Sequence, residues 1–222
     1  MKLSSSYLST HQTFVRPFPK NFEPDANLTK PAWEGIPKLI LKDFRGSGNT
    51  ISGVHTRVAV AYTNSRLYLA YWCDYIQLNY YEDTQPGQER WQLWDRDVVE
   101  VFINPLPQQM SSYWEFEVSP NNQWIDLKIN LDRDPVLDAS WNSGFLHATK
   151  VDEKRKQWTC EMSIPVSSMG ILRIYPGMEW RINFYRCDGI GDIEQRRLLA
   201  WSPTLDDSFH IPNRFGLIQF QP

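Results

Sequence analysis

Carboxylate side chains occur within two short apolar segments, at positions where a strand would present them on one face. Residues 97–103 carry Glu100 among valines and an isoleucine, and residues 113–119 carry Glu115 and Glu117 among Trp, Phe and Val. Successive side chains of a strand point to opposite faces. Each segment is therefore predicted to have an apolar core face and a second face that carries carboxylates.

Two further segments continue this alternation and add an amide, a cation and rings to the second face. Residues 124–129 alternate Ile and Leu with Asp126, and residues 179–186 alternate Ile182 and Phe184 with polar or aromatic side chains. The predicted core residues are Val99, Val101, Phe116, Val118, Leu127, Ile182 and Phe184. The predicted second face carries Glu100, Glu117, Asp126, Arg181, Asn183 and Tyr185.

A face of this kind suits sugars, because sugar hydroxyls need paired donors and acceptors and the C–H faces of the ring stack on aromatic side chains. The alternative is a solvated sheet face with cross-strand ion pairs, which is common in antiparallel sandwiches. Glycoside hydrolysis needs two carboxyl groups roughly 5 to 9 Å apart, and strand neighbours always lie within such distances. The pattern alone leaves these interpretations open.

Other chemistries lack their motifs in this sequence. There is no GxSxG, P-loop or GxGxxG motif, and the four histidines show no HExxH or comparable zinc-binding spacing. Cys73, Cys160 and Cys187 form no CxxC pair, and their odd number cannot close into a complete disulfide framework. The cysteines are therefore expected to be buried small hydrophobic residues.

Composition excludes some classes of partner. The net charge is −3 and the pI is about 5.8, which argues against nucleic acid and anionic membranes as partners. The start of the chain lacks the apolar region of a signal peptide, and no apolar run approaches the roughly 20 residues that span a bilayer. A soluble protein is expected, extracellular or periplasmic if a signal was removed and cytoplasmic otherwise. Protein partners stay open.

The chain is predicted to form one all-β domain, an antiparallel, jelly-roll-like β-sandwich. Five prolines fall in the first 37 residues, so residues 1–24 are expected to form an extended segment and residues 25–222 the sandwich. Predicted strands cover residues 56–62, 66–72, 97–103, 113–119, 124–129, 144–151, 157–164, 179–186, 197–202 and 216–220. Hairpin turns are predicted at 63–65 and 120–122, and one helical turn at 165–170.

The order of several motifs resembles family 9 carbohydrate-binding modules and their β-sandwich relatives. Residues 94–103, WDRDVVEVFI, resemble the family's WxxDxVEvFi motif. The other matching stretches are PAW at 31–33, LYLA at 67–70 with Asp74, the strand at 113–119, the strand at 158–165, WSP at 201–203 and RFGL at 214–217. The resemblance covers roughly residues 25–220 and implies non-catalytic carbohydrate binding, as in an accessory domain for polysaccharide metabolism.

The resemblance implies a site that holds a monosaccharide or the end of an oligosaccharide between two aromatic side chains. The matching aromatic positions are Trp94 and Phe209, and Glu100 and Asp206 are expected to accept sugar hydroxyls. The residues expected to line the floor are Glu117, Arg181, Asn183 and Tyr185. This chain departs from the family pattern twice: Glu117 stands where an arginine is expected, and Phe209 replaces a tryptophan.

Structural calcium is a further implication of the resemblance. The candidate ligands are the loop carboxylates Asp74, Asp132, Asp134 and Asp188, although the chain shows no EF-hand-like spacing. Turn-forming aspartates are the alternative interpretation of these positions.

Three competing functions stay open at the level of sequence. A related haem-binding sandwich of oxidoreductases would hold haem through Met plus His or Lys, and Met110 lies beside the right strands with no evident partner. A glycoside-active enzyme would use the carboxylate face. The third alternative is a domain that keeps the fold and has lost the sugar site.

Overall fold

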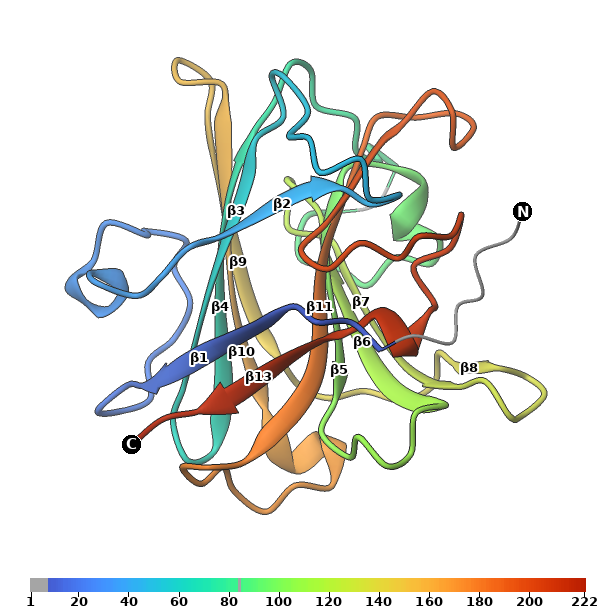
Figure 1. Ribbon diagram of the computed structural model, residues 1–222. Coiled ribbons are helices and arrows are strands. Elements are labelled where there is room, and N and C mark those ends of the chain that lie inside the picture. The colour runs from blue at the N-terminus through green and yellow to red at the C-terminus, as the bar shows by residue number, and fades with distance from the viewer. Residues whose placement is uncertain (1–7, 84) are drawn as a thin grey trace.

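The computed structural model describes residues 8–83 and 85–222, which form β-strands joined by loops and short 3-10 helices (Figure 1). Residues 1–7 of the expected extended segment lie outside the described residues. The strands are β1 (Gln12–Pro17), β2 (Leu39–Asp43), β3 (Thr56–Tyr62), β4 (Arg66–Asp74), β5 (Val98–Asn104), β6 (Ser112–Val118), β7 (Trp124–Asn130), β8 (Leu137–Asp138), β9 (Leu146–Asp152), β10 (Gln157–Pro165), β11 (Glu179–Asp188), β12 (Arg197–Ala200) and β13 (Gly216–Phe220). The 3-10 helices are η1 (Pro31–Trp33), η2 (Leu93–Asp95), η3 (Val166–Met169) and η4 (Pro212–Arg214). None of the described helices has the length and apolar character needed to cross a membrane.

The strands form two layers that are joined at their edges. One layer has the order β8-β7-β6-β5-β11-β12, and the other has the order β3-β4-β10-β9. Strand β2 pairs with both β12 and β3, and β1 pairs with both β13 and β3, so each of them links the two layers (Figure 1). The pairings of β1 are parallel, whereas the other described strand pairs are antiparallel. The predicted all-β sandwich is confirmed.

All ten predicted strands are present, and the predicted helical turn is η3. The turn at 63–65 closes the β3–β4 hairpin, where the Thr63 amide donates to the carbonyl of Arg66. The β6–β7 turn contains Asn122 at a φ of 66°, a conformation that asparagine tolerates better than most residues. Strands β1, β2 and β8 were not predicted, because they are short or lie beside prolines and carry weak alternation.

Most of the predicted core residues lie between the two layers. Val99 and Val101 of β5 and Ile182 and Phe184 of β11 are fully buried there, and Phe116 and Val118 of β6 join them. The predicted core face is therefore confirmed for three neighbouring strands, β5, β6 and β11.

The predicted orientation of β7 is wrong. Leu127 is the cross-strand partner of Glu115 on β6 and packs on the outer face of the layer. Asp126 is the partner of Phe116 and points toward the sandwich core. The buried Asp126 carboxylate is accommodated because its Oδ2 accepts hydrogen bonds from the amide and the hydroxyl of Ser143, at 2.8 and 2.5 Å. The apolar face of β7 does not mark the sandwich core, because both faces of this layer carry buried apolar clusters.

The outer face of the first layer carries a second apolar cluster, which we call the outer cluster. It consists of Phe44, Leu93, Val98, Phe102, Tyr113, Ile125, Leu127, Ile129, Tyr185, Cys187, Leu198, Ala200 and Phe215. Strand β5 contributes to both clusters, with Val99 facing the sandwich core and Phe102 facing the outer cluster. Loops that follow β4, β11 and β12 must therefore cover this face.

The segment before β2 is fixed to the second layer by one buried carboxylate. Glu161 of β10 accepts hydrogen bonds from the amides of Asp25 and Ala26, from the Lys30 ammonium and from the indole N–H of Trp33. These four donors satisfy the buried charge, so the carboxylate holds the proline-rich segment against the sheet.

We expect Val101→Ala to lower the free energy of unfolding by about 1 to 3 kcal/mol, because it leaves a cavity in the fully buried core. Val136→Ala, at a position that is 43% exposed, is the matched control and should change stability by less than about 0.5 kcal/mol. Urea denaturation of the three proteins measures both values, and equal losses in the two variants would contradict this placement of β5.

Candidate functional site

A cavity of about 280 Å³ opens on the outer face of the first layer, at the edge of the outer cluster. It is lined by Trp94, Glu100, Phe102, Glu115, Leu127, Leu137, Cys187, Ile193, Arg196, Leu198, Asp207, Ser208, Phe209 and His210. Apolar side chains and rings form much of this lining, with a few polar groups among them, which is the usual character of small-molecule sites.

Trp94 stands at the cavity on the 3-10 turn η2, immediately before β5. The neighbouring Leu93 is fully buried in the outer cluster and so fixes the turn to the sheet. The guanidinium of Arg196 donates to the Trp94 carbonyl, and the ring of Trp91 meets the Trp94 ring edge-on at 5.0 Å between centroids. These contacts hold Trp94 half-buried beside the cavity.

Asp97 connects the start of β5 to two loops at the same end of the sheet. Its buried carboxylate accepts hydrogen bonds from the amides of Asn79 and Gly189, at 2.9 and 2.6 Å. The chain that carries Trp94 is therefore tied both to the loop after β4 and to the loop after β11.

Phe209 comes to the cavity from the long loop between β12 and β13. Its ring stacks on the ring of Tyr185 with 4.1 Å between centroids and 12° between planes, and Phe44 meets it edge-on. The Tyr185 hydroxyl donates to the Phe209 carbonyl at 3.0 Å. Tyr185 thus covers one face of the Phe209 ring and fixes its position.

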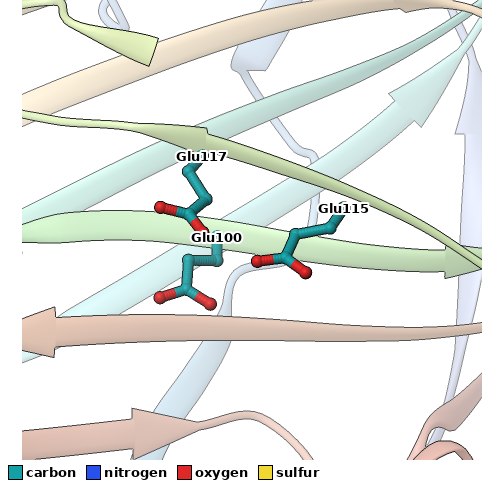
Figure 2. A group of neighbouring side chains, drawn as sticks. All are labelled: Glu100, Glu115 and Glu117. Atoms are coloured by element: carbon teal, nitrogen blue, oxygen red, sulfur yellow. The ribbon is translucent and has the colours of Figure 1, made fainter. Parts of the chain in front are cut away.

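Three glutamates from adjacent strands meet at the floor of the site. Glu100 of β5 and Glu115 of β6 line the cavity, and Glu117 of β6 lies beside them (Figure 2). One carboxylate oxygen from each lies within 4.8 Å of the others, and all three side chains are buried. Register explains the grouping, because Glu117 is the cross-strand partner of Glu100 and Glu115 is two residues away on the same face.

Burial and mutual repulsion favour the protonated forms of Glu100 and Glu117. Burial, followed by the nearby Glu115 carboxylate, raises the pKa of Glu100 to about 8. Burial, followed by the Glu100 carboxylate, raises the pKa of Glu117 well above its ordinary value. The Cys187 thiol donates to Glu100 Oε1 at 3.0 Å and partly offsets these effects.

The structure brings three of the predicted site residues together at one cavity and gives the others different surroundings. Trp94, Phe209 and Glu100 line one cavity, with Glu117 directly behind Glu100. Tyr185 supports Phe209 from outside the cavity lining.

Arg181, Asn183 and Asp206 have other surroundings. Arg181 donates to the carbonyls of Phe215 and Ser9, and Asn183 exchanges hydrogen bonds with the backbone of Ser202. Asp206 is exposed and outside the lining, whereas the next residues of its loop take part in it.

Several lining residues were not predicted. Glu115 shares the alternation of Glu117, so the pattern contained its signal. Asp207, Ser208 and His210 flank Phe209 in sequence, and Arg196 belongs to the β11–β12 loop; no spacing rule identifies these.

The four aspartates considered as calcium ligands do not form a cluster. Asp188 is occupied by Arg186 and Arg197, at 2.6 and 2.5 Å, and Asp74 accepts from Gln157. Asp132 and Asp134 lie together in the exposed loop after β7. Among the described residues, Glu100, Glu115 and Glu117 are the one group of three His, Cys, Asp or Glu side chains whose ligand atoms lie close enough to share an ion. The cavity lining also does not contain Met110, the residue considered for haem.

We expect Glu117→Gln to stabilise the protein at pH 8 in buffer free of divalent cations. A raised pKa in the folded state contributes stability that is present below the ordinary pKa of about 4.5 and is lost as the pH rises through the folded-state pKa. Glutamine does not titrate, so the stability difference should grow between pH 5 and pH 8. Urea midpoints across this range test it, with Glu34→Gln at an exposed position as control, and a constant difference would contradict it.

The same fold occurs in solved structures from bacteria. A crystal structure of a Bacteroides uniformis protein matches with a TM-score of 0.76 and 18% identity, over 95% of this chain and 99% of that one. A family 9 carbohydrate-binding module from Caldicellulosiruptor kristjanssonii, solved with cellotriose, matches with a TM-score of 0.67 and 15% identity over 95% and 93% of the two chains. A glucose complex from the same organism gives a TM-score of 0.66 and 16% identity over 95% of each chain.

Sequence comparison adds a relative and a family. An "Extracellular protein" of Arthroderma benhamiae is 26% identical over 176 residues, which are 74% of this chain and 78% of that protein. The family model described as "Carbohydrate family 9 binding domain-like" matches residues 25–221. Because this match covers nearly the whole chain, the protein belongs to the carbohydrate family 9 binding domain-like family.

Proposed function

We propose that this protein binds carbohydrate without catalysis and takes a monosaccharide, or one end of an oligosaccharide, into the cavity beside Trp94. The observation that carries the proposal is the convergence of Trp94, Phe209 and Glu100 at one cavity. These residues come from a turn, a distant loop and a strand. Together they supply two aromatic rings and a buried carboxylate that can accept hydrogen bonds from sugar hydroxyls.

The chemistry of the lining supports a sugar ring as ligand. One face of Phe209 is covered by Tyr185, and both Phe209 and the half-buried Trp94 line the cavity. Aromatic rings stack on the C–H faces of sugars, and polar groups such as Glu100, Arg196 and His210 can pair with hydroxyls. His210 is held in place by the Tyr113 hydroxyl, 2.7 Å from its Nδ1.

The size of the cavity favours a single ring. Its volume of about 280 Å³ lies just below the roughly 300 to 1,000 Å³ typical of ligand pockets. A long polysaccharide chain would need an extended groove, whereas a sugar end can enter and leave the rest of the chain in solvent.

Membership of a family of binding modules supports a non-catalytic role. The arrangement of the acids supports it too, because glycosidases place two carboxyl groups on either side of the bond they cleave. Here Glu100, Glu115 and Glu117 share one patch of the floor and lie within 4.8 Å of one another. The solved complexes of the Caldicellulosiruptor kristjanssonii modules make glucose and cello-oligosaccharides the first ligands to test.

We expect Trp94→Ala and Phe209→Ala each to weaken sugar binding about tenfold, because a ring stacked on a sugar contributes about 1 kcal/mol or more. A glycan array followed by calorimetry on the best ligand measures this, and chromatography of the ligand after prolonged incubation detects any hydrolysis. Sustained turnover of the ligand by the purified protein would overturn the non-catalytic proposal.

Matched controls separate the site from general effects of removing a ring. Phe14→Ala removes an exposed phenylalanine from β1, and Trp124→Ala removes a tryptophan that packs on Phe145 and His147. Both controls should bind like the parent. If Trp94→Ala and Phe209→Ala also bind like the parent while folded, the sugar does not occupy this cavity.

A further inference from the structure

The three glutamates at the cavity floor have the geometry of a cation site. Three points that all lie within 4.8 Å of one another have a common centre no more than about 2.8 Å from each, which is close to the 2.3 to 2.6 Å of calcium–oxygen bonds. Figure 2 shows the three carboxylates gathered on one side of β5 and β6. Small side-chain adjustments therefore suffice for three oxygens to share one ion.

The acceptors in this cluster are also unpartnered. Both carboxylate oxygens of Glu117 and Oε2 of Glu115 are buried and have no hydrogen-bond donor among the described residues. Buried polar atoms are almost always satisfied, and leaving one unpaired is destabilising, most of all when it is charged. Glu117 is fully buried and lies within the cluster, so its oxygens are satisfied either by a proton shared with a neighbouring acid or by a cation from outside the chain.

Two other buried carboxylates of the same protein are satisfied internally. Glu161 accepts four donors that include the Lys30 ammonium, and Asp188 is paired with Arg186 and Arg197. Asp126, outside the floor, keeps one unpaired oxygen, but its Oδ2 accepts two hydrogen bonds from Ser143. Among the described residues, Glu117 is the buried carboxylate with both oxygens unpaired.

The protein supplies too little positive charge to the floor to balance three carboxylates. Arg196 is the cation in the cavity lining; its Nη2 donates to the Trp94 carbonyl, and its buried Nε has no hydrogen-bond partner among the described residues. One guanidinium therefore faces three carboxylates. Arg45, near the rim, is paired with Glu194 and Asp207.

We propose that Glu100, Glu115 and Glu117 hold a calcium ion at the floor of the cavity. Carboxylate oxygens are hard ligands, and calcium accepts six to eight oxygen ligands in irregular geometry. Magnesium demands a near-ideal octahedron, and zinc prefers His and Cys. Glu100 and Glu115 line the cavity, so the coordination positions on that side are open to water or to a ligand.

A consequence for the ligand rests on the proposed carbohydrate binding. Neighbouring hydroxyls of a sugar ring offer oxygen ligands of the kind that calcium accepts, so they can replace water on the ion while the ring lies against Trp94 or Phe209. The sugar should then be held by the ion as well as by the rings.

The site is tested first without any sugar. Calcium is titrated calorimetrically into chelator-treated protein, and thermal unfolding is followed with and without 5 mM calcium. We expect one ion per chain at or below about 1 mM and a higher melting temperature with calcium. Glu117→Gln and Glu115→Gln should each weaken calcium binding at least about tenfold, whereas Glu34→Gln, at an exposed position, should bind like the parent.

Three results would overturn the site: no saturable binding up to 5 mM calcium, unchanged calcium affinity in both floor variants while they remain folded, or zinc binding in preference to calcium. Circular dichroism of the metal-free variants checks that they are folded.

A second titration measures sugar affinity in chelator and in saturating calcium. A loss of at least about tenfold without calcium supports the ion as part of the sugar site, and equal affinities would contradict that part. Calcium binding without binding of any sugar leaves the ion site standing and overturns the proposed function, so the two failures are distinguishable.

Discussion

The burial of strand β5 on both of its faces is the constraint on which the site depends. Its seven residues are all buried, with Val99 and Val101 in the sandwich core and Glu100 and Phe102 on the other face. A central antiparallel strand usually has one solvated face. Here loops after β4, β11 and β12 close over the second face, so a carboxylate on that face has little access to water and must find its partners within the cavity.

The loops that close this face also provide the specific contacts. Arg196 from the β11–β12 loop holds the Trp94 carbonyl, and the β12–β13 loop places Phe209 on Tyr185. The Asp97 carboxylate accepts hydrogen bonds from backbone amides of two of the covering loops. The pairing register of the strands thus fixes the positions of the side chains at the floor. Loops anchored to the same sheet position the side chains of the walls, as is common in binding sites on rigid scaffolds.

The sequence predicts the elements well because alternation and turn residues are local signals, and it fails where burial depends on distant loops. On β7 the alternation predicts that Leu127 lies in the sandwich core. Leu127 instead packs in the outer cluster under the loops, and Asp126 lies on the core side, where Ser143 donates to its carboxylate. Motif order identified Trp94, Phe209 and Glu100. Alternation alone also predicted Asn183 as a site residue, but its side-chain amide forms hydrogen bonds with the Ser202 backbone. A period of two predicts which face of the sheet a side chain lies on, and it does not predict the partner of that side chain.

The position of Glu117 determines the electrostatic character of the floor. An arginine at this position would pair with Glu100, its cross-strand neighbour, and satisfy that carboxylate within the chain. A glutamate instead adds a second buried acid, and Glu115 adds a third on the same face. Such a group is stable only as protonated acids or around a bound cation, because three close, unpaired carboxylates repel one another strongly in a medium of low dielectric. The residue at position 117 therefore sets the charge of the floor, and with it the kind of ligand that the floor can accept.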